Sequence, residues 1–281
     1  MDRTPALVSV DWLIRHRHDP DVRLLDASFY LPNQNRDARA EYLQRHLPGA
    51  VFFDVDEIAD RSSELPHMLP SPEQFGQQVG SLGIDNADRV VVYDADRFLA
   101  SARAWWMFRA MGHHEVMVLD GGLSAWTAAG QPLDSGEVAV EPRRFVARYQ
   151  PELVRSLEQV RATLDGRREQ ILDARSAGRF YGRDPEPRAG LRAGHIPGSA
   201  NLPFGDLVDT DGRMKPNDQL AMSFDGAGVD LRLPMTATCG SGVSAAVLAL
   251  AAYQLGKDDL AVYDGSWTEW GGREDVPVVT E

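Results

Sequence analysis

The chain of 281 residues has little of what disulfide-linked and zinc-binding proteins are built from. It contains one cysteine, which excludes an internal disulfide and a cysteine-based zinc site. Its histidines and carboxylates do not cluster at metal-ligand spacing either. We therefore expect no bound metal, and a reducing, cytoplasmic setting fits the single thiol best.

Long apolar runs and positive charge are also scarce. No stretch approaches the roughly 18 apolar residues of a membrane span, and the first 22 residues contain no uninterrupted apolar segment, so neither membrane insertion nor export is expected. The formal net charge of -13 argues against sequence-independent binding of nucleic acid. It also repels small anions at long range, so an anionic substrate needs a local basic site.

The chain does contain an internal repeat. The first half carries RLLDA, HLPGAVFFDVDEI, DRVVVYDAD and EVMVLDGG, and the second half carries, in the same order, QILDA, HIPGSANLPFGDL, LPMTATC and LAVYDGS. The spacing from Asp120 to Trp126 equals that from Asp264 to Trp270. The sequence therefore predicts a duplicated domain.

Within each half, short apolar runs of strand length alternate with longer segments of helical period. This pattern is typical of the α/β class, with an open, mainly parallel sheet and helices on both faces. An apolar fraction of 43% is ample for two cores. We predict one domain over residues 1–135, a polar linker over 136–150 and a second domain over 151–281.

The lone thiol, Cys239, lies at the predicted end of a strand, where sites form in open α/β sheets. A free cysteine often packs as a small hydrophobe, and that interpretation remains an alternative. Here Gly240 and Gly242 follow it, in a short loop whose backbone N–H groups can turn inward ahead of a helix. These N–H groups and the helix dipole would stabilise a thiolate, so the pattern favours chemistry over packing.

The equivalent place in the first half is occupied by Asp94, at or next to the position of Cys239 in the repeat. The glycine-rich loop is absent there, and an aspartate cannot act as a sulfur nucleophile. We therefore expect one catalytic half and one inert half.

The repeat, the paired HLPGA and HIPGSANLPF segments and the loop that begins at the cysteine resemble the two-domain rhodanese, or sulfurtransferase, family. The resemblance covers essentially the whole chain and implies two tandem rhodanese-like domains. The loop CGSGVSA is similar to the CGSGVTA loop of members that use 3-mercaptopyruvate, with Ser244 in place of threonine. Members that use thiosulfate carry basic side chains in this loop. Because this loop has none, the resemblance favours 3-mercaptopyruvate as the donor.

The family resemblance implies a persulfide mechanism. Cys239 would take sulfur from the donor, releasing pyruvate, and a thiol acceptor such as a thioredoxin-like protein, or cyanide, would collect it. No metal or organic cofactor is required. The backbone of the loop would hold the anionic sulfur; its residues after the cysteine are Gly240, Ser241, Gly242, Val243 and Ser244.

The same resemblance implicates Ser241 as a proton relay, and Asp56 and His67 as its partners from the first half. A loop serine also serves as a turn former, and a histidine beside prolines as a structural residue, so both alternatives stay open. For the donor's carboxylate the resemblance singles out Arg179 and Arg188, whose planar guanidinium groups fit a carboxylate at two points. The alternative is that these arginines pair with Asp184 and Glu186.

Other classes of function remain open to different degrees. A phosphatase with a similar loop needs an arginine six residues after the cysteine, and Ala245 stands there. A cysteine hydrolase needs a histidine base, and none is close in sequence. Transfer from thiosulfate, or a persulfide relay module for a partner protein, is compatible with the same residues.

Overall fold

The computed structural model describes residues 3–31, 34–166 and 169–281. The chain folds into two compact units. Unit 1 comprises Met1–Asp60, Leu69–Gln150 and Thr210–Met214, and unit 2 comprises Arg61–Met68, Pro151–Asp209 and Lys215–Glu281. Two short segments, 61–68 and 210–214, therefore pack with a different unit from their neighbours in sequence.

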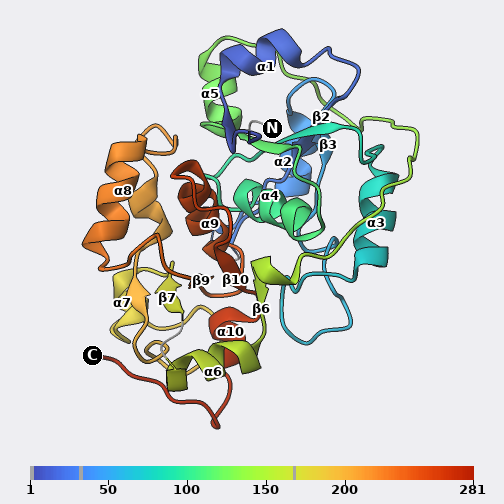
Figure 1. The fold of residues 1–281 in the computed structure, drawn as a ribbon. Coiled ribbons are helices and arrows are strands. Elements are labelled where there is room, and N and C mark those ends of the chain that lie inside the picture. Colours follow the sequence, from blue (N-terminus) through green and yellow to red (C-terminus); the bar gives the residue numbers. More distant parts are fainter. Residues whose placement is uncertain (1–2, 32–33, 167–168) are drawn as a thin grey trace. The chain divides into compact units, whose positions relative to one another are not determined.

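In unit 1, parallel strands alternate with helices (Figure 1). Among the described residues the strands form one five-stranded sheet in the order β1-β5-β4-β2-β3, with every pairing parallel. The elements are β1 (Leu7–Val8), α1 (Val10–His16), β2 (Val22–Asp26), α2 (Ala38–Gln44), β3 (Val51–Phe52), α3 (Pro72–Ser81), β4 (Arg89–Tyr93), α4 (Ser101–Ala110), β5 (Val116–Leu119) and α5 (Gly122–Ala128).

Unit 2 repeats this topology. Its described strands form a five-stranded sheet in the order β6-β10-β9-β7-β8, again with every pairing parallel. The elements are η2 (Pro151–Leu153), β6 (Val154–Arg155), α6 (Leu157–Gly166), β7 (Gln170–Asp173), α7 (Ala177–Phe180), β8 (Ala200–Asn201), η3 (Phe204–Leu207), α8 (Asn217–Gly226), β9 (Met235–Thr238), α9 (Ala245–Gln254), β10 (Ala261–Tyr263) and α10 (Ser266–Trp270). The predicted α/β class and the predicted duplication are confirmed.

The central strands are buried on both faces, which explains their continuous apolar sequences. Residues Val90–Tyr93 of β4 are all buried, and so is the whole of β9. Helix α4 packs on β4 and β5, and α9 packs on β9 and β10. Helices α4 and α9 thus occupy equivalent places in the two units, each following a central strand. Asp94 and Cys239 lie at the ends of those strands, β4 and β9.

Residues 136–150, predicted as a linker, run along unit 1 with regular contacts. The N–H of Arg143 donates to the carbonyl of Gly80 (2.8 Å), and the N–H of Arg148 donates to that of Met111 (2.8 Å). Phe145 is buried, and a β-carbon on Gly76 would lie 2.8 Å from its carbonyl oxygen. Residues 136–150 therefore pack as part of unit 1 as well as connecting it to the next segment of the chain.

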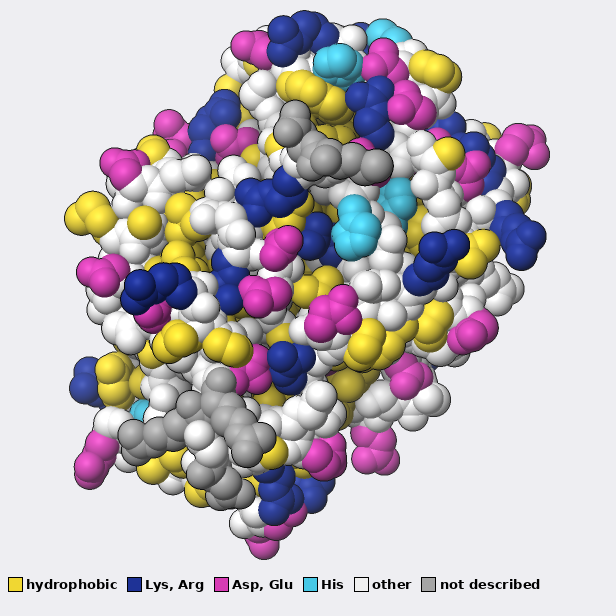
Figure 2. Space-filling model, in the orientation of Figure 1, with side chains coloured by type: hydrophobic (Ala, Val, Ile, Leu, Met, Phe, Trp, Pro, Cys, Tyr) yellow, Lys and Arg dark blue, Asp and Glu magenta, His cyan; other side chains and the backbone are white. Residues whose placement is uncertain are grey.

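The surface carries both signs of charge. Figure 2 shows Lys and Arg side chains interspersed with Asp and Glu side chains over the face drawn, so the net negative charge is not gathered there into one acidic patch. In the described part of the chain, no helix combines the length and the apolar character needed to cross a membrane.

Candidate active site around Cys239

Cys239 directly follows β9 and precedes the loop that leads into α9. Its side chain is buried, with 1% of the residue exposed. Gly242 in the loop has a φ of 79°, a left-handed conformation that favours glycine and turns the backbone tightly. The whole of Ala245–Tyr253 is buried, so the N-terminus of α9 is held rigidly behind the thiol.

The first residues of α10 hold the cysteine loop from the other side. The N–H of Trp267 donates to the carbonyl of Cys239 (2.9 Å). Both the N–H (2.9 Å) and the hydroxyl (2.6 Å) of Thr268 donate to the carbonyl of Gly240. These three bonds orient the peptide groups of Cys239 and Gly240.

Ser266 contacts the cysteine most directly. Its Oγ accepts a hydrogen bond from the N–H of Cys239 (3.1 Å), donates to the carbonyl of Tyr263 (2.8 Å) and lies 4.0 Å from the Cys239 Sγ. Ser266 is fully buried and has a φ of 49°, which is costly for a residue with a side chain. The matching residue of unit 1 is Gly122, with a φ of 52°. The fold needs a left-handed residue at this place, and only the unit with the thiol puts a hydroxyl there.

Ser241 and His67 form the second polar pair of the site. His67 Nδ1 lies 3.1 Å from Ser241 Oγ, and both residues are buried members of unit 2. His67 also has a left-handed backbone, with a φ of 61°. Such strain persists where the surroundings determine the conformation, which is common at functional sites.

Arg179, on α7, brings positive charge to the cysteine loop. A β-carbon on Gly240 would lie 3.1 Å from Arg179 Nη2, so the glycine leaves room for the guanidinium group. Arg179 also donates from Nε (3.2 Å) and Nη2 (2.6 Å) to Glu186 Oε2. Arg179 therefore pairs with Glu186, as the alternative interpretation expected, and it also lies against the cysteine loop at Gly240.

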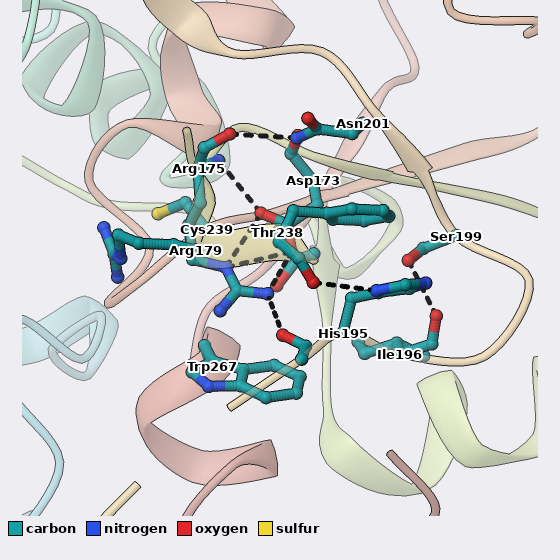
Figure 3. A network of polar contacts seen from close by, with 12 residues as sticks. Asp173, Arg175, Arg179, His195, Ile196, Ser199, Asn201, Thr238, Cys239 and Trp267 are labelled. Carbon is teal, nitrogen blue, oxygen red and sulfur yellow. Dashed lines mark hydrogen bonds and ion pairs between the residues drawn. The ribbon is translucent and has the colours of Figure 1, made fainter. Parts of the chain in front are cut away.

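Behind Arg179 lies a buried ionic network, part of which is drawn in Figure 3. Arg175 bonds both carboxylate oxygens of Asp173 and donates from Nη1 to Glu186 Oε1 (2.7 Å). Its guanidinium lies 4.2 Å from the ring centroid of Trp267. Burial acts to lower the pKa of Arg175, but the charges of Asp173 and Glu186 outweigh it, so this pKa is raised. Glu186 therefore joins a fixed arginine to Arg179.

The other predicted site residues lie as follows. Val243 and Gly242 are buried in the loop, and Ser244 is half-buried at the N-cap of α9. Arg188 is half-buried in the loop after α7. Asp56 belongs to unit 1, is exposed, and donates its N–H to Asp54 Oδ1 (3.0 Å). Unit 2 alone thus contains every predicted site residue except Asp56, and His67 belongs to it through the segment Arg61–Met68.

Comparison with known proteins identifies the family of the chain. The family model of the rhodanese-like domain matches residues 9–129 and 156–273. The chain belongs to the rhodanese-like domain family. It is 48% identical over 280 residues to the 3-mercaptopyruvate sulfurtransferase of Homo sapiens, covering 96% of this chain and 94% of that protein. It is 47% identical over 275 residues to the thiosulfate sulfurtransferase of Bos taurus, covering 95% of this chain and 92% of that protein.

A solved structure gives the same result. The crystal structure of SseA from Escherichia coli, described as a 3-mercaptopyruvate sulfotransferase, matches with a TM-score of 0.86 and 40% identity. The match covers 94% of this chain and 99% of SseA. The predicted resemblance to the two-domain rhodanese family is confirmed.

Sequence reasoning missed several residues of this rhodanese-like site, among them Ser266, Thr268 and the second role of Glu186. The internal repeat contains the signal for Ser266: the first half has DGG where the second half has DGS, so the two halves differ at this position. The sequence indicates Glu186 only as an alternative partner of Arg179 and Arg188, whereas in the structure Glu186 also bonds the buried Arg175. In the described residues, no group of three or more His, Cys, Asp and Glu side chains is arranged to hold a metal ion.

Proposed function

We propose that this protein is a 3-mercaptopyruvate sulfurtransferase, in which Cys239 carries the transferred sulfur. The observation that carries the proposal is a buried thiol in a loop without basic side chains, with the guanidinium of Arg179 against Gly240. A carboxylate-bearing donor fits one local cation beside a neutral loop. The named relatives support the same activity.

In the first half-reaction the thiolate of Cys239 attacks the sulfur of 3-mercaptopyruvate. A sulfur–sulfur bond forms and the carbon–sulfur bond breaks, with its electron pair passing to the enolate of pyruvate. The enolate gains one proton, which balances the proton that the donor thiol loses, so the products are pyruvate and an anionic persulfide on Cys239. In the second half-reaction a thiol or cyanide takes the outer sulfur and restores the thiolate.

The proton transfer is assigned to Ser241 and His67. Their side chains are in hydrogen-bond contact at 3.1 Å, and a hydroxyl beside an imidazole can hand on a proton and recover it. We assign Asp56 to the same relay on family resemblance alone. The loop residues Gly240, Gly242, Val243 and Ser244 supply backbone N–H groups that stabilise the anionic sulfur, helped by the dipole of α9.

Arg179 and Arg188 are assigned to the donor's carboxylate. Glu186 bonds Nε and Nη2 of Arg179, which leaves its Nη1 and the second hydrogen of Nη2 for a two-point contact with a carboxylate. Arg188 lies in the same loop as Glu186 and would supply a second charge. We also propose that the protein works in the cytoplasm, where its single thiol stays reduced.

The test is a side-by-side assay of the purified protein with 3-mercaptopyruvate and thiosulfate as donors and cyanide as acceptor. A higher kcat/KM for 3-mercaptopyruvate supports the proposal. A preference for thiosulfate, the donor in the name of the Bos taurus relative, would leave sulfur transfer in place and overturn the donor assignment. Transfer that occurs only with one protein acceptor would identify a relay module.

A further inference from the structure

The loop after β4 in unit 1 encloses a buried carboxylate. Asp94 is 4% exposed. Its Oδ1 accepts hydrogen bonds from the N–H groups of Asp96 (3.1 Å) and Phe98 (3.2 Å), and its Oδ2 accepts from those of Ala100 (3.2 Å) and Ser101 (2.8 Å). Four backbone donors of one loop therefore converge on one anionic group.

This loop occupies the place of the cysteine loop in unit 2. Asp94 follows β4 and leads to α4, as Cys239 follows β9 and leads to α9. The carbonyl of Asp94 accepts from the N–H of Leu123 (3.0 Å), and the carbonyl of Cys239 accepts from that of Trp267 (2.9 Å). The side chain of Asp94 thus stands at the position of the thiol.

The backbone of the loop after β4 is strained. Arg97 and Phe98 are consecutive non-glycine residues in the left-handed region, with φ of 54° and 66°. Burial raises the pKa of Asp94. Hydrogen bonds from the loop oppose this rise, and the bond from the backbone of Ser101 opposes it most. The four N–H bonds to the carboxylate thus counter part of the cost of burying its charge, and they hold the strained loop around it.

A cavity of about 240 Å³ adjoins the enclosed carboxylate. It lies within unit 1, and besides Asp94 its lining includes Phe98, Gly121 and Asp211. A small anion that took the place of the carboxylate would therefore have space to enter the loop.

We propose that unit 1 keeps an anion-binding loop at the position of the active-site loop, and that the carboxylate of Asp94 is its built-in ligand. In the native protein this carboxylate closes the loop to external anions, which leaves unit 2 as the unit that can accept an anionic donor. Without the carboxylate, the loop is a site for a small monocarboxylate such as formate. The anion-binding loop is argued from the contacts of unit 1 alone, and the clause about the donor in unit 2 rests on the proposed function.

The first test is chemical rescue of Asp94→Ala by formate. This substitution leaves four N–H groups without their acceptor, which lowers stability. Because an anion that binds the folded state stabilises it, the melting temperature of the variant should rise with formate concentration at constant ionic strength. The native protein, and the variant in formamide, the neutral analogue of formate, should show no such rise. Equal responses of variant and native protein would overturn the proposal.

The second test remains available if Asp94→Ala does not fold. Asp94→Cys combined with Cys239→Ser places the only thiol of the chain in the loop of unit 1. The ultraviolet absorbance of the thiolate, followed against pH, should give a thiol pKa well below the ordinary value of about 8.5. Burial alone raises the pKa of a thiol, so a value at or above 8.5 would show that the loop does not stabilise an anion.

Discussion

Glu186 holds Arg179 by two of its guanidinium nitrogens and, with its other carboxylate oxygen, bonds the fully buried Arg175. Arg175 in turn is bonded to Asp173 at the end of β7. The orientation of Arg179 is therefore set by a chain of ion pairs that begins at a central strand. One edge of the guanidinium is fixed by Glu186, and we propose that its other edge binds the donor's carboxylate.

Replacement of Glu186 by Gln should loosen this orientation. Because bonds to charged groups are worth about 1.5–3 kcal/mol, the KM for 3-mercaptopyruvate should rise at least about tenfold, with a smaller change in kcat. Glu169→Gln is the matched control, since Glu169 pairs with Arg155 of β6 and not with Arg175 or Arg179. A KM that falls in Glu186→Gln would mean that Glu186 competes with the donor for Arg179.

Arg188→Ala should weaken use of 3-mercaptopyruvate through binding. Truncation of one partner of a desolvated charge pair costs roughly 2–5 kcal/mol, which corresponds to a rise in KM of about thirtyfold or more. Arg183→Ala is the control, because Arg183 is exposed in the same loop. Steady-state constants of Arg188→Ala that match those of the native protein would show that the carboxylate binds elsewhere.

The substitutions Ser266→Gly and Ser266→Ala distinguish the effect of backbone strain at this residue from the effect of losing its hydroxyl group. Both remove the acceptor for the Cys239 N–H, so both should lower kcat/KM about tenfold. Glycine accepts the φ of 49° freely, so Ser266→Gly should be more stable than Ser266→Ala by about 1 kcal/mol. Urea unfolding and donor assays measure the two effects. Full activity of either variant would show that the hydroxyl of Ser266 does not position Cys239.

His67→Asn removes the imidazole and keeps a residue that tolerates a left-handed backbone. If His67 and Ser241 act as one relay, His67→Asn and Ser241→Ala should each slow pyruvate release by about 10²–10⁴-fold. The double variant should then be no slower than the more damaged single variant. Single-turnover release of pyruvate is the measurement, and multiplicative losses would contradict a shared step.

Much of the fold could be predicted because its signals are local. Apolar runs marked the central strands, and the repeated DGG and DGS segments marked the duplication. The position of Cys239 between β9 and α9 followed from the strand that precedes it and the alanine-rich helix that follows. These features depend on residues that are neighbours in sequence.

What could not be predicted depends on distant contacts. The family resemblance named His67 as a partner of Ser241, but nothing in LPHMLP itself indicates that His67 packs with unit 2 and meets a residue 174 positions away. Nor does the spacing of Glu186 show that its two oxygens face two different arginines, since that follows from the folding of the loop after α7. Site partners that come together only through tertiary folding leave no periodic signal.

The central claim is that Cys239 carries the transferred sulfur, and the mass of the intact protein tests it most directly. After incubation with 3-mercaptopyruvate and no acceptor, we expect the native protein to gain the mass of one sulfur atom and to lose it when cyanide is added. Cys239→Ser should remain folded, gain no mass and transfer no sulfur. A sulfur adduct or sulfur transfer in Cys239→Ser would place the nucleophile elsewhere and contradict the account.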